Sequence, residues 1–358
     1  MATITASEPV RSWSSKREMR KLLAVGTTTM FGFLILLAFL LPIGYMGVTS
    51  VKSLQQVIDP NSMLMPMSPV TLNYEGKDYP LYNVPFPDGS TRVMALYEPY
   101  REHSLLVDPN NPSAAPIDWT GRWRTLAPVQ KLQPTWTNYE QTWNILDMGV
   151  LFRNTLIIAI AGTIGTLLSS ILVAYGFARF RLPYGNVIFL VLMATIILPT
   201  QVTLIPTYIF FRAIGWGGTW WPLIIPHFFA NAYNVFLLRQ YFKGIPKDLD
   251  EAAMIDGASP IQVLLRVIIP QSWPVILAVS MFHFFFAWND FFAPLVYLTG
   301  HENLYTISIG LTQFNNAFNT QPGLLQAGAV MAVILPVIVF FLAQRVFMQG
   351  IVITGVEK

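Results

Sequence analysis

The sequence predicts an all-α polytopic membrane protein whose six transmembrane helices are interrupted by one polar insert after the first span. Of its 358 residues, 53% are hydrophobic and only 11% are charged, whereas ordinary soluble domains carry about 25% charged residues. Apolar runs of about 20 residues, the length that crosses a bilayer, recur along the chain. Between two of the later runs lies one dense stretch of charge, residues 243–270.

The N-terminal tail, residues 1–21, is basic and precedes an apolar run that we expect to be the first span, residues 22–50. A cleaved signal peptide has an apolar core of about 7–15 residues. The run in this chain is longer, so we expect it to remain in the membrane as a helix.

Residues 51–149 differ in kind, because they are polar and hold no apolar run long enough to span a bilayer. Alternating residues at 70–74 and 91–97, with turn signals at Glu75-Gly76 and Asp88-Gly89, predict a few short strands. We therefore expect a small extracytoplasmic insert that contains β-structure.

The chain becomes apolar again over residues 150–350, where we expect five more spans. Their predicted ranges are 151–177, 187–211, 220–238, 273–298 and 324–347. With six spans, both termini lie on the same side of the membrane. The loops on that side hold most of the Lys and Arg, and basic loops favour the cytoplasmic side. Both termini, including the tail at 351–358, are therefore expected in the cytoplasm.

The charged stretch, residues 243–270, has the signals of two short helices joined by a bend, and we call it the elbow. Pro246 suits a first helical turn, and the acidic residues that follow suit the positive end of the helix dipole. Gly257 predicts the end of the first helix. Ser259 opens a capping box for the second helix, and Pro270 is expected to end it. The second helix should turn one apolar face inward, made of Ile261, Leu264, Leu265 and Ile268.

Glu251-Ala252-Ala253, Asp256-Gly257-Ala258 and Ile268-Ile269-Pro270 together resemble the EAA loop of permease subunits in binding-protein-dependent ABC importers. The form is nearest to the maltose type in the carbohydrate branch, although the usual leucine before the final proline is Ile269 here. The resemblance covers residues 150–350 and implies a type I importer transmembrane domain in a bacterial or archaeal cell membrane. The insert departs from the branch, whose first external loop is commonly shorter.

In that family the loop is a cytoplasmic coupling helix that docks into a cleft on an ATP-hydrolysing subunit. The resemblance thus implies as partners a second, homologous permease subunit, two ATP-binding-cassette subunits, an extracytoplasmic sugar-binding protein and the lipid bilayer. ATP and Mg²⁺ would lie on the partner subunits, with no cofactor on this chain. The implied coupling residues are Asp250, Glu251, Ala252, Ala253, Ile255, Asp256, Gly257, Ala258 and Pro270.

Within the elbow, we expect Glu251 to accept hydrogen bonds that brace the loop, Ala252 and Ala253 to keep the contact face flat, and Gly257 to permit the bend. The alternative is an amphipathic helix resting on lipid. Such helices usually carry a Lys/Arg-rich polar face, whereas acidic residues predominate here and anionic headgroups would repel them. Docking of a helix into a protein groove fits this charge better.

Two interruptions in the later spans mark a candidate substrate path. Segment 198–206 holds two prolines, and broken helices often line transporter pathways; a simple kink is the alternative. Segment 288–290 places a carboxylate within an apolar run, where it usually faces the bundle interior or a water-filled path; a structural role in bracing helices is the alternative. The candidate pathway residues are Gln201, Asn231, Asn234, Trp288, Asn289 and Asp290.

Small residues recur near one face of the second span and predict close helix packing rather than a path. They are Gly162, Gly165, Ser169 and Gly176. Catalytic chemistry finds little support. The sequence has no G-x-x-x-x-G-K-[ST] phosphate loop, no cysteine and no H-E-x-x-H zinc pair among its four histidines. A net charge of +3 gives no reason to expect a nucleic-acid partner.

The predicted function is that of a permease subunit that moves a sugar or oligosaccharide, delivered by the binding protein, into the cytoplasm by alternating access. A polyol or glycerol phosphodiester as solute stays open. An ion-coupled secondary transporter would need more intramembrane charge and often an internal repeat. A membrane enzyme or scaffold would need catalytic polar clusters or a purely structural loop.

Overall fold

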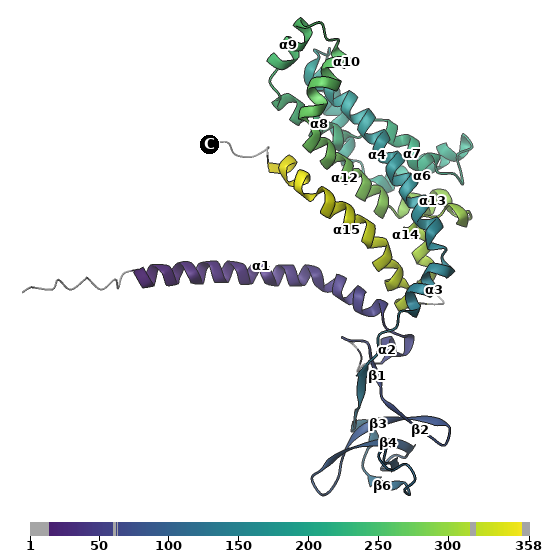
Figure 1. Ribbon diagram of the computed structural model, residues 1–358. Helices are drawn as coiled ribbons and strands as arrows, with labels where there is room; N and C mark the ends of the chain where they lie inside the picture. Colours follow the sequence, from purple (N-terminus) through teal and green to yellow (C-terminus); the bar gives the residue numbers. More distant parts are fainter. Residues whose placement is uncertain (1–13, 60–61, 63, 316–319, 353–358) are drawn as a thin grey trace, which may run out of the picture. The chain divides into compact units, whose positions relative to one another are not determined.

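The computed structural model describes residues 14–59, 62, 64–315 and 320–352, and the chain divides into two compact units, residues 1–134 and 135–358 (Figure 1). Most of the predicted cytoplasmic tails, 1–13 and 353–358, lies outside the described residues. The first unit opens with α1 (Ser14–Ser50), 37 residues long, which contains the predicted first span. The short α2 (Leu54–Ile58) follows and is capped by Ser53 and Gln56 in a capping box.

The rest of the first unit is antiparallel β-structure, with strand order β2-β3-β4-β5-β6 in its larger sheet, β7 added beside β3, and a separate pair of β1 with β8. The predicted strands at 70–74 and 91–97 correspond to β2 and β4. The glycines of the two predicted turns, Gly76 and Gly89, have φ of +77° and +82°, a region open to glycine without strain. The strands are β1 (Met67–Pro69), β2 (Thr71–Tyr74), β3 (Lys77–Pro85), β4 (Thr91–Pro99), β5 (His103–Val107), β6 (Ile117–Thr120), β7 (Ala127–Pro128) and β8 (Gln130–Leu132).

The larger sheet of the insert buries side chains on both of its faces. On β4, Met94 and Leu96 enter one apolar cluster with Trp119, whereas Ala95 enters a second cluster on the other face. Successive side chains of a strand point to opposite faces, so this alternation gives each face a core. The Trp119 indole nitrogen also donates to the Pro85 carbonyl oxygen at 2.9 Å.

The second unit is helical. Its helices outside the elbow are α3 (Thr137–Ile145), α4 (Met148–Arg179), α5 (Gly185–Ala194), α6 (Thr200–Ala213), α7 (Trp221–Ile224), α8 (Ala232–Gly244), α12 (Trp273–Asn289), α13 (Phe292–Leu298), α14 (Ile307–Gly310) and α15 (Pro322–Val352). Short 3₁₀ turns lie at Thr195–Ile197, Ile225–Phe228, Glu302–Leu304 and Leu311–Phe314. The boundary between the units falls at Pro134 rather than at residue 149. The reason is that α3 packs on α15, where the Thr142 hydroxyl donates to the Leu324 carbonyl at 3.1 Å.

Three described helices are long and apolar enough to cross a membrane, at 18–50, 148–179 and 322–345. Up to five such spans result if each of two bent pairs counts as one. In the first pair, 185–197 and 201–213 meet at 100°. This bend lies at Pro199, where the sequence predicted an interruption of the span. In the second, 260–271 meets 273–289 at 82°. The predicted fourth span, 220–238, is not one helix, because a break at 229–231 separates α7 and its 3₁₀ turn from α8.

Helices α4, α8 and α12 pack together at the centre of the second unit (Figure 1). Gly162 and Gly165 let α4 approach its neighbours closely, as the spacing of small residues predicted. A Cβ atom at 162 would come within 2.9 Å of His283 Nε2, and one at 165 within 2.6 Å of the Phe228 ring. Gly176 differs, because nothing lies within 4 Å of the position its Cβ would take.

Candidate functional site

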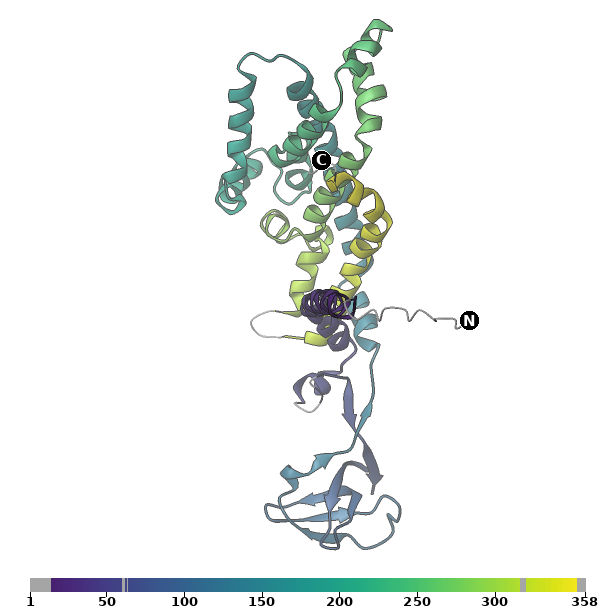
Figure 2. The same cartoon turned by 90° about the vertical axis from the view of Figure 1, so that its left-hand side faces the viewer.

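The elbow is built as two short helical segments joined at a glycine, and it forms the green segment at the top of Figures 1 and 2. Helix α9 (Asp248–Ile255) carries three acidic residues in its first turn. Gly257 follows with φ of +85°, the left-handed conformation that commonly ends a helix. Pro246 lies before the Lys247 N-cap rather than in the first turn.

The second segment comprises α10 (Pro260–Val263), a π-helical turn (Leu264–Ile268) and α11 (Ile269–Gln271). The predicted capping box is present: Ser259 Oγ accepts from the Gln262 backbone, and Gln262 Oε1 accepts from the Ser259 backbone at 2.7 Å. Pro270 does not end the segment, which continues to Gln271. Proline cannot donate the usual i→i−4 hydrogen bond, and the wider π-turn immediately before it accommodates that loss.

A buried ion pair fastens the elbow to the end of α4. Arg179 Nε lies 2.6 Å from Asp250 Oδ2, and the two side chains are only 6% and 10% exposed. The same guanidinium donates from Nη2 to the Ile245 carbonyl oxygen at 3.0 Å. One arginine therefore holds both the start of α9 and the chain that leads into it. The carboxylate that braces the elbow in the structure is that of Asp250. The hydrogen bonds expected for Glu251 stay a prediction.

The electrostatics of this pair indicate that it fixes the position of the elbow on α4 and adds little net stability to the fold. Burial raises the pKa of the Asp250 carboxyl above its ordinary value, and the Arg179 guanidinium opposes that shift. A raised pKa means that ionising this carboxyl costs more free energy in the folded chain than in water. Buried pairs often add little net stability for this reason, yet leaving either partner alone is costly.

A second contact joins the elbow to α4 one turn earlier. The Tyr175 hydroxyl donates to the Pro260 carbonyl oxygen at 3.0 Å, at the first position of α10. Between the two contacts, Ala253 and Ala258 pack partly buried against the apolar core shared by α4, α8 and α12. Ala253 was predicted to face the contact surface; it faces this core, while Ala252 is exposed. Both arms of the elbow are thus fixed to the helix bundle.

Away from these contacts, the elbow exposes both acidic and large apolar side chains. Glu251 and Asp256 are exposed there, and Ile255 is 87% exposed. The predicted inward face of the second segment is split: Leu264 and Ile268 are buried, but Ile261 and Leu265 point outward. The exposed apolar set is Leu249, Met254, Ile255, Ile261 and Leu265. A surface of this composition suits a protein groove better than anionic lipid.

A cavity of about 370 Å³ lies in the helix bundle, among α4, α6, α7, α12 and α13. It brings together two of the predicted pathway residues, Gln201 and Asp290, which are 89 positions apart in the chain. The hydroxyl groups of Thr203 and Thr207 and the His227 ring add polar lining, and Ile158 represents α4. Asp290 also organises the break between α12 and α13, since its Oδ1 accepts from the Ala293 backbone at 3.4 Å.

The other four predicted pathway residues do not line this cavity. Trp288 is buried, stacks on Phe284 and donates to the Ala332 carbonyl at 3.2 Å, so its role here is packing. Asn231 caps α8, Asn234 is buried on the same helix, and Asn289 donates back to the Phe285 carbonyl at 2.8 Å. For Trp288 and Asn289, the structure therefore favours the bracing alternative.

A histidine pair was missed because its members are 56 residues apart in the sequence. The His227 and His283 ring centroids lie 4.4 Å apart with the rings edge-on. His283 Nδ1 lies 3.2 Å from the Thr166 hydroxyl, and His227 lines the cavity. The signal that could have found the pair is the glycine at 162, whose missing side chain leaves room for both rings.

Helix α4 joins the two parts of the site. Its end holds the elbow through Tyr175 and Arg179, and Ile158 lies at the cavity. The 22 residues from Ile158 to Arg179 span about 30 Å of continuous helix. A displacement of the elbow would therefore be carried by a stiff element to the cavity wall.

Residues 165–352 match the family described as binding-protein-dependent transport system inner membrane component. The chain is 33% identical over 241 residues to the osmoprotective compounds uptake permease GgtD of Synechocystis, a match covering 67% of this chain and 80% of the relative. It is 31% identical over 236 residues to the sn-glycerol-3-phosphate permease UgpE of Pectobacterium atrosepticum, covering 64% and 82%. It is 27% identical over 229 residues to the alpha-glucoside permease AglG of Rhizobium meliloti, covering 62% and 60%.

Among solved structures, the fold is similar to that of a chain in a bacterial ABC transporter that imports the acidic polysaccharide alginate. The TM-score is 0.64 with 18% sequence identity, and the match covers 95% of this chain and 99% of that chain. Because so much of this chain is covered, most of the insert at 51–149 lies within the match. The insert is therefore not foreign to this architecture, although the sequence resemblance did not extend to it.

Proposed function

The chain belongs to the family of inner-membrane components of binding-protein-dependent transport systems, and we propose that it is the permease subunit of an ATP-driven importer for a sugar or oligosaccharide. The observation that carries this proposal is the elbow. Its outer side offers acidic and apolar side chains to a partner, and its inner side is fixed to α4 by a buried ion pair of 2.6 Å. A surface helix that served only to rest on lipid would not need such an attachment.

In the proposed mechanism, two partner subunits hydrolyse ATP and move the docked elbow. Arg179 and Tyr175 pass this movement to α4, and the shared core passes it to α8 and α12. Helices α4 and α12 reach the cavity at Ile158 and Phe286, and Asp290, which follows α12, also lines it. Rearrangement of the cavity wall then exposes the solute path to one side of the membrane and afterwards to the other, as in alternating access.

The solute proposed is polyhydroxylated. The cavity offers an amide, hydroxyl groups and a carboxylate for hydrogen bonds, together with aromatic surface at Phe211 and Tyr297. The alpha-glucoside permease supports a sugar, whereas the glycerol-phosphate permease supports a small phosphorylated polyol. The carboxylate of Asp290 favours the neutral solute of the two, because a phosphate beside it would be repelled.

The assembly proposed contains a second permease chain, two ATP-binding-cassette subunits that hold ATP and Mg²⁺, and an extracytoplasmic binding protein. One chain presents one elbow, so two permeases are needed to engage two ATP-hydrolysing subunits. The distribution of Lys and Arg supports a cytoplasmic position for the elbow and both termini. The insert then faces the binding protein.

Affinity purification of the tagged chain from its native membrane tests this proposal. An ATP-binding subunit is expected to copurify, and the reconstituted complex is expected to hydrolyse ATP faster when solute-loaded binding protein is added. Recovery of the intact chain without an ATP-binding partner, together with uptake driven by an ion gradient, would instead support a secondary transporter.

A further inference from the structure

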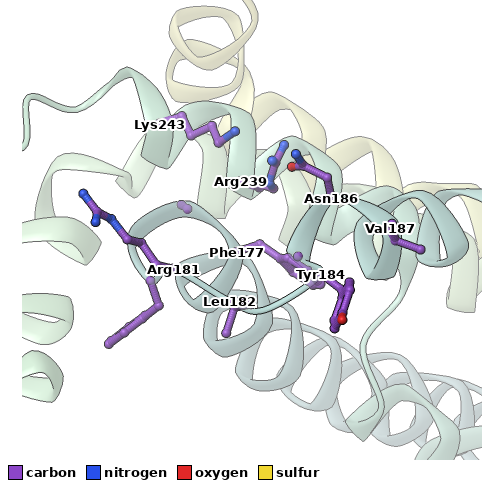
Figure 3. Close-up of a pocket in the computed structure, with 11 residues that line it drawn as sticks. Phe177, Arg181, Leu182, Tyr184, Asn186, Val187, Arg239 and Lys243 are labelled. Atoms are coloured by element: carbon purple, nitrogen blue, oxygen red, sulfur yellow. The ribbon is translucent and has the colours of Figure 1, made fainter.

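A second cavity, of about 480 Å³, lies where the end of α4, the following loop, the start of α5 and the end of α8 meet (Figure 3). Three cationic side chains line it: Arg181 on the loop, and Arg239 and Lys243 one turn apart on α8. Figure 3 shows Asn186 of α5 beside Arg239. The remaining large side chains of the lining are Phe177, Phe180, Leu182, Tyr184 and Val187.

The positive charge of this pocket is not neutralised from within the described part of the chain. Among the described residues, the ion pairs are Arg92 with Asp88 and Arg179 with Asp250. None of the three pocket cations is therefore paired with a described carboxylate. Arg239 lies over the Phe189 ring at 3.9 Å, and its buried Nε atom has no hydrogen-bond partner. Burial and the positive charges of Arg239 and Lys247 lower the pKa of Lys243. An anion would relieve this repulsion.

The surroundings of the pocket indicate what kind of anion fits. Helix α5 leaves the pocket with its apolar side chains exposed, among them Val187, Ile188, Leu190 and Val191. Because α5 belongs to a bent helix pair apolar enough to span a membrane, this surface is suited to contact with hydrocarbon chains. The pocket thus offers cations and an amide next to an apolar track, which matches a molecule with a phosphate at one end and acyl chains at the other. Basic pockets at the ends of membrane helices are suited to anionic headgroups.

We propose that this pocket binds the headgroup phosphate of an anionic phospholipid, with the acyl chains lying along α5. Arg239 and Lys243 contact the phosphate, Asn186 donates to it, and Arg181 closes the outer side. The site is separate from the solute cavity, so it goes beyond the proposed transport function and does not depend on which solute is carried. Because α8 also packs on α4, an occupied pocket would brace the helix end that holds the elbow.

The test uses the full-length chain purified in detergent and titrated with phosphatidylglycerol or phosphatidylcholine, with bound lipid counted by native mass spectrometry. Phosphatidylglycerol is expected to bind and phosphatidylcholine is not. Lys243→Gln should weaken phosphatidylglycerol binding about fivefold, and Arg239→Gln with Lys243→Gln should weaken it at least about tenfold, since each basic side chain contributes separately. The charge-matched control, Arg266→Gln with Arg345→Gln, changes two exposed cations outside the pocket and should leave binding unchanged.

Three results would overturn the proposal. Equal phosphatidylglycerol binding by the double variant and the control would remove the pocket from lipid binding. Competition by inorganic phosphate or glycerophosphoglycerol as strong as that by the lipid would show a site for a soluble anion. Loss of the lipid in the assembled transporter, with a cross-link from position 243 to a partner subunit, would assign the pocket to an interface. Lys243 is exposed, so its single substitution keeps the test valid even if the double variant folds poorly.

Discussion

Replacing Asp250 with alanine is expected to lower the free energy of unfolding by about 3–5 kcal/mol, because the change leaves the Arg179 charge buried without its partner. Arg179→Ala should cost at least as much, since it also removes the hydrogen bond to the Ile245 carbonyl. Thermal unfolding of the purified chain in detergent measures both effects. Asp248→Ala is the matched control, because Asp248 lies on the same helix turn but is exposed.

The double variant Arg179→Met with Asp250→Leu separates the effect of the ion pair on the position of the elbow from its effect on the stability of the fold. Apolar side chains of similar size restore much of the lost stability when they replace a buried pair, and we expect unfolding close to that of the wild type. ATP hydrolysis should nevertheless respond weakly to the loaded binding protein, because the guanidinium no longer holds Ile245. A double variant that recovered both stability and stimulation would show that the pair has no part in coupling.

Gly257→Val is expected to abolish most of the stimulation of ATP hydrolysis by the loaded binding protein while leaving the chain in the membrane. The φ of +85° at this position is strained for a β-branched residue. A cost of about 1–2 kcal/mol would change the equilibrium between the observed geometry of the elbow and another geometry by about tenfold. ATP hydrolysis by the reconstituted complex is the measurement. Gly244→Val is the control, since Gly244 has open space and an ordinary helical conformation.

Glu251→Lys tests the outer surface of the elbow in the same assay. The side chain is exposed, so reversing its charge should not disturb the fold but should weaken docking of the acidic face. A decrease comparable to that of Gly257→Val is expected. If both variants kept full stimulation, the elbow would not be the place where ATP hydrolysis is coupled to the spans.

The local design of the elbow could be predicted from the sequence because its signals are local. The glycine bend and the capping box at Ser259 depend on residues within one or two turns. The ion pair could not be predicted, because it joins residues 71 positions apart. From the sequence we expected Glu251 to brace the loop, but the acidic residue that packs against Arg179 at the end of α4 is Asp250.

For the candidate pathway, the sequence predicted where the spans break but not which side chains line the cavity. Gln201 and Asp290 were chosen as polar residues at breaks in apolar runs, and the breaks do bring both to one cavity. Trp288 and Asn289 share that local pattern but do not line the cavity. Their orientation around the axis of α12 directs them to other contacts. The fourth span was predicted as continuous since 220–238 is mostly apolar, whereas Pro222 and Pro226 limit its first part to short turns.

Cross-linking from position 255 in the intact assembly tests the central claim most directly. The chain has no cysteine, so Ile255→Cys provides a single reactive thiol at a side chain that is 87% exposed. With a short photoreactive maleimide, we expect cross-links from the elbow to the subunit that hydrolyses ATP. Leu190→Cys, exposed on α5, should give none to that subunit. An elbow that cross-linked only to lipid, in an assembly still active in ATP hydrolysis, would contradict the account.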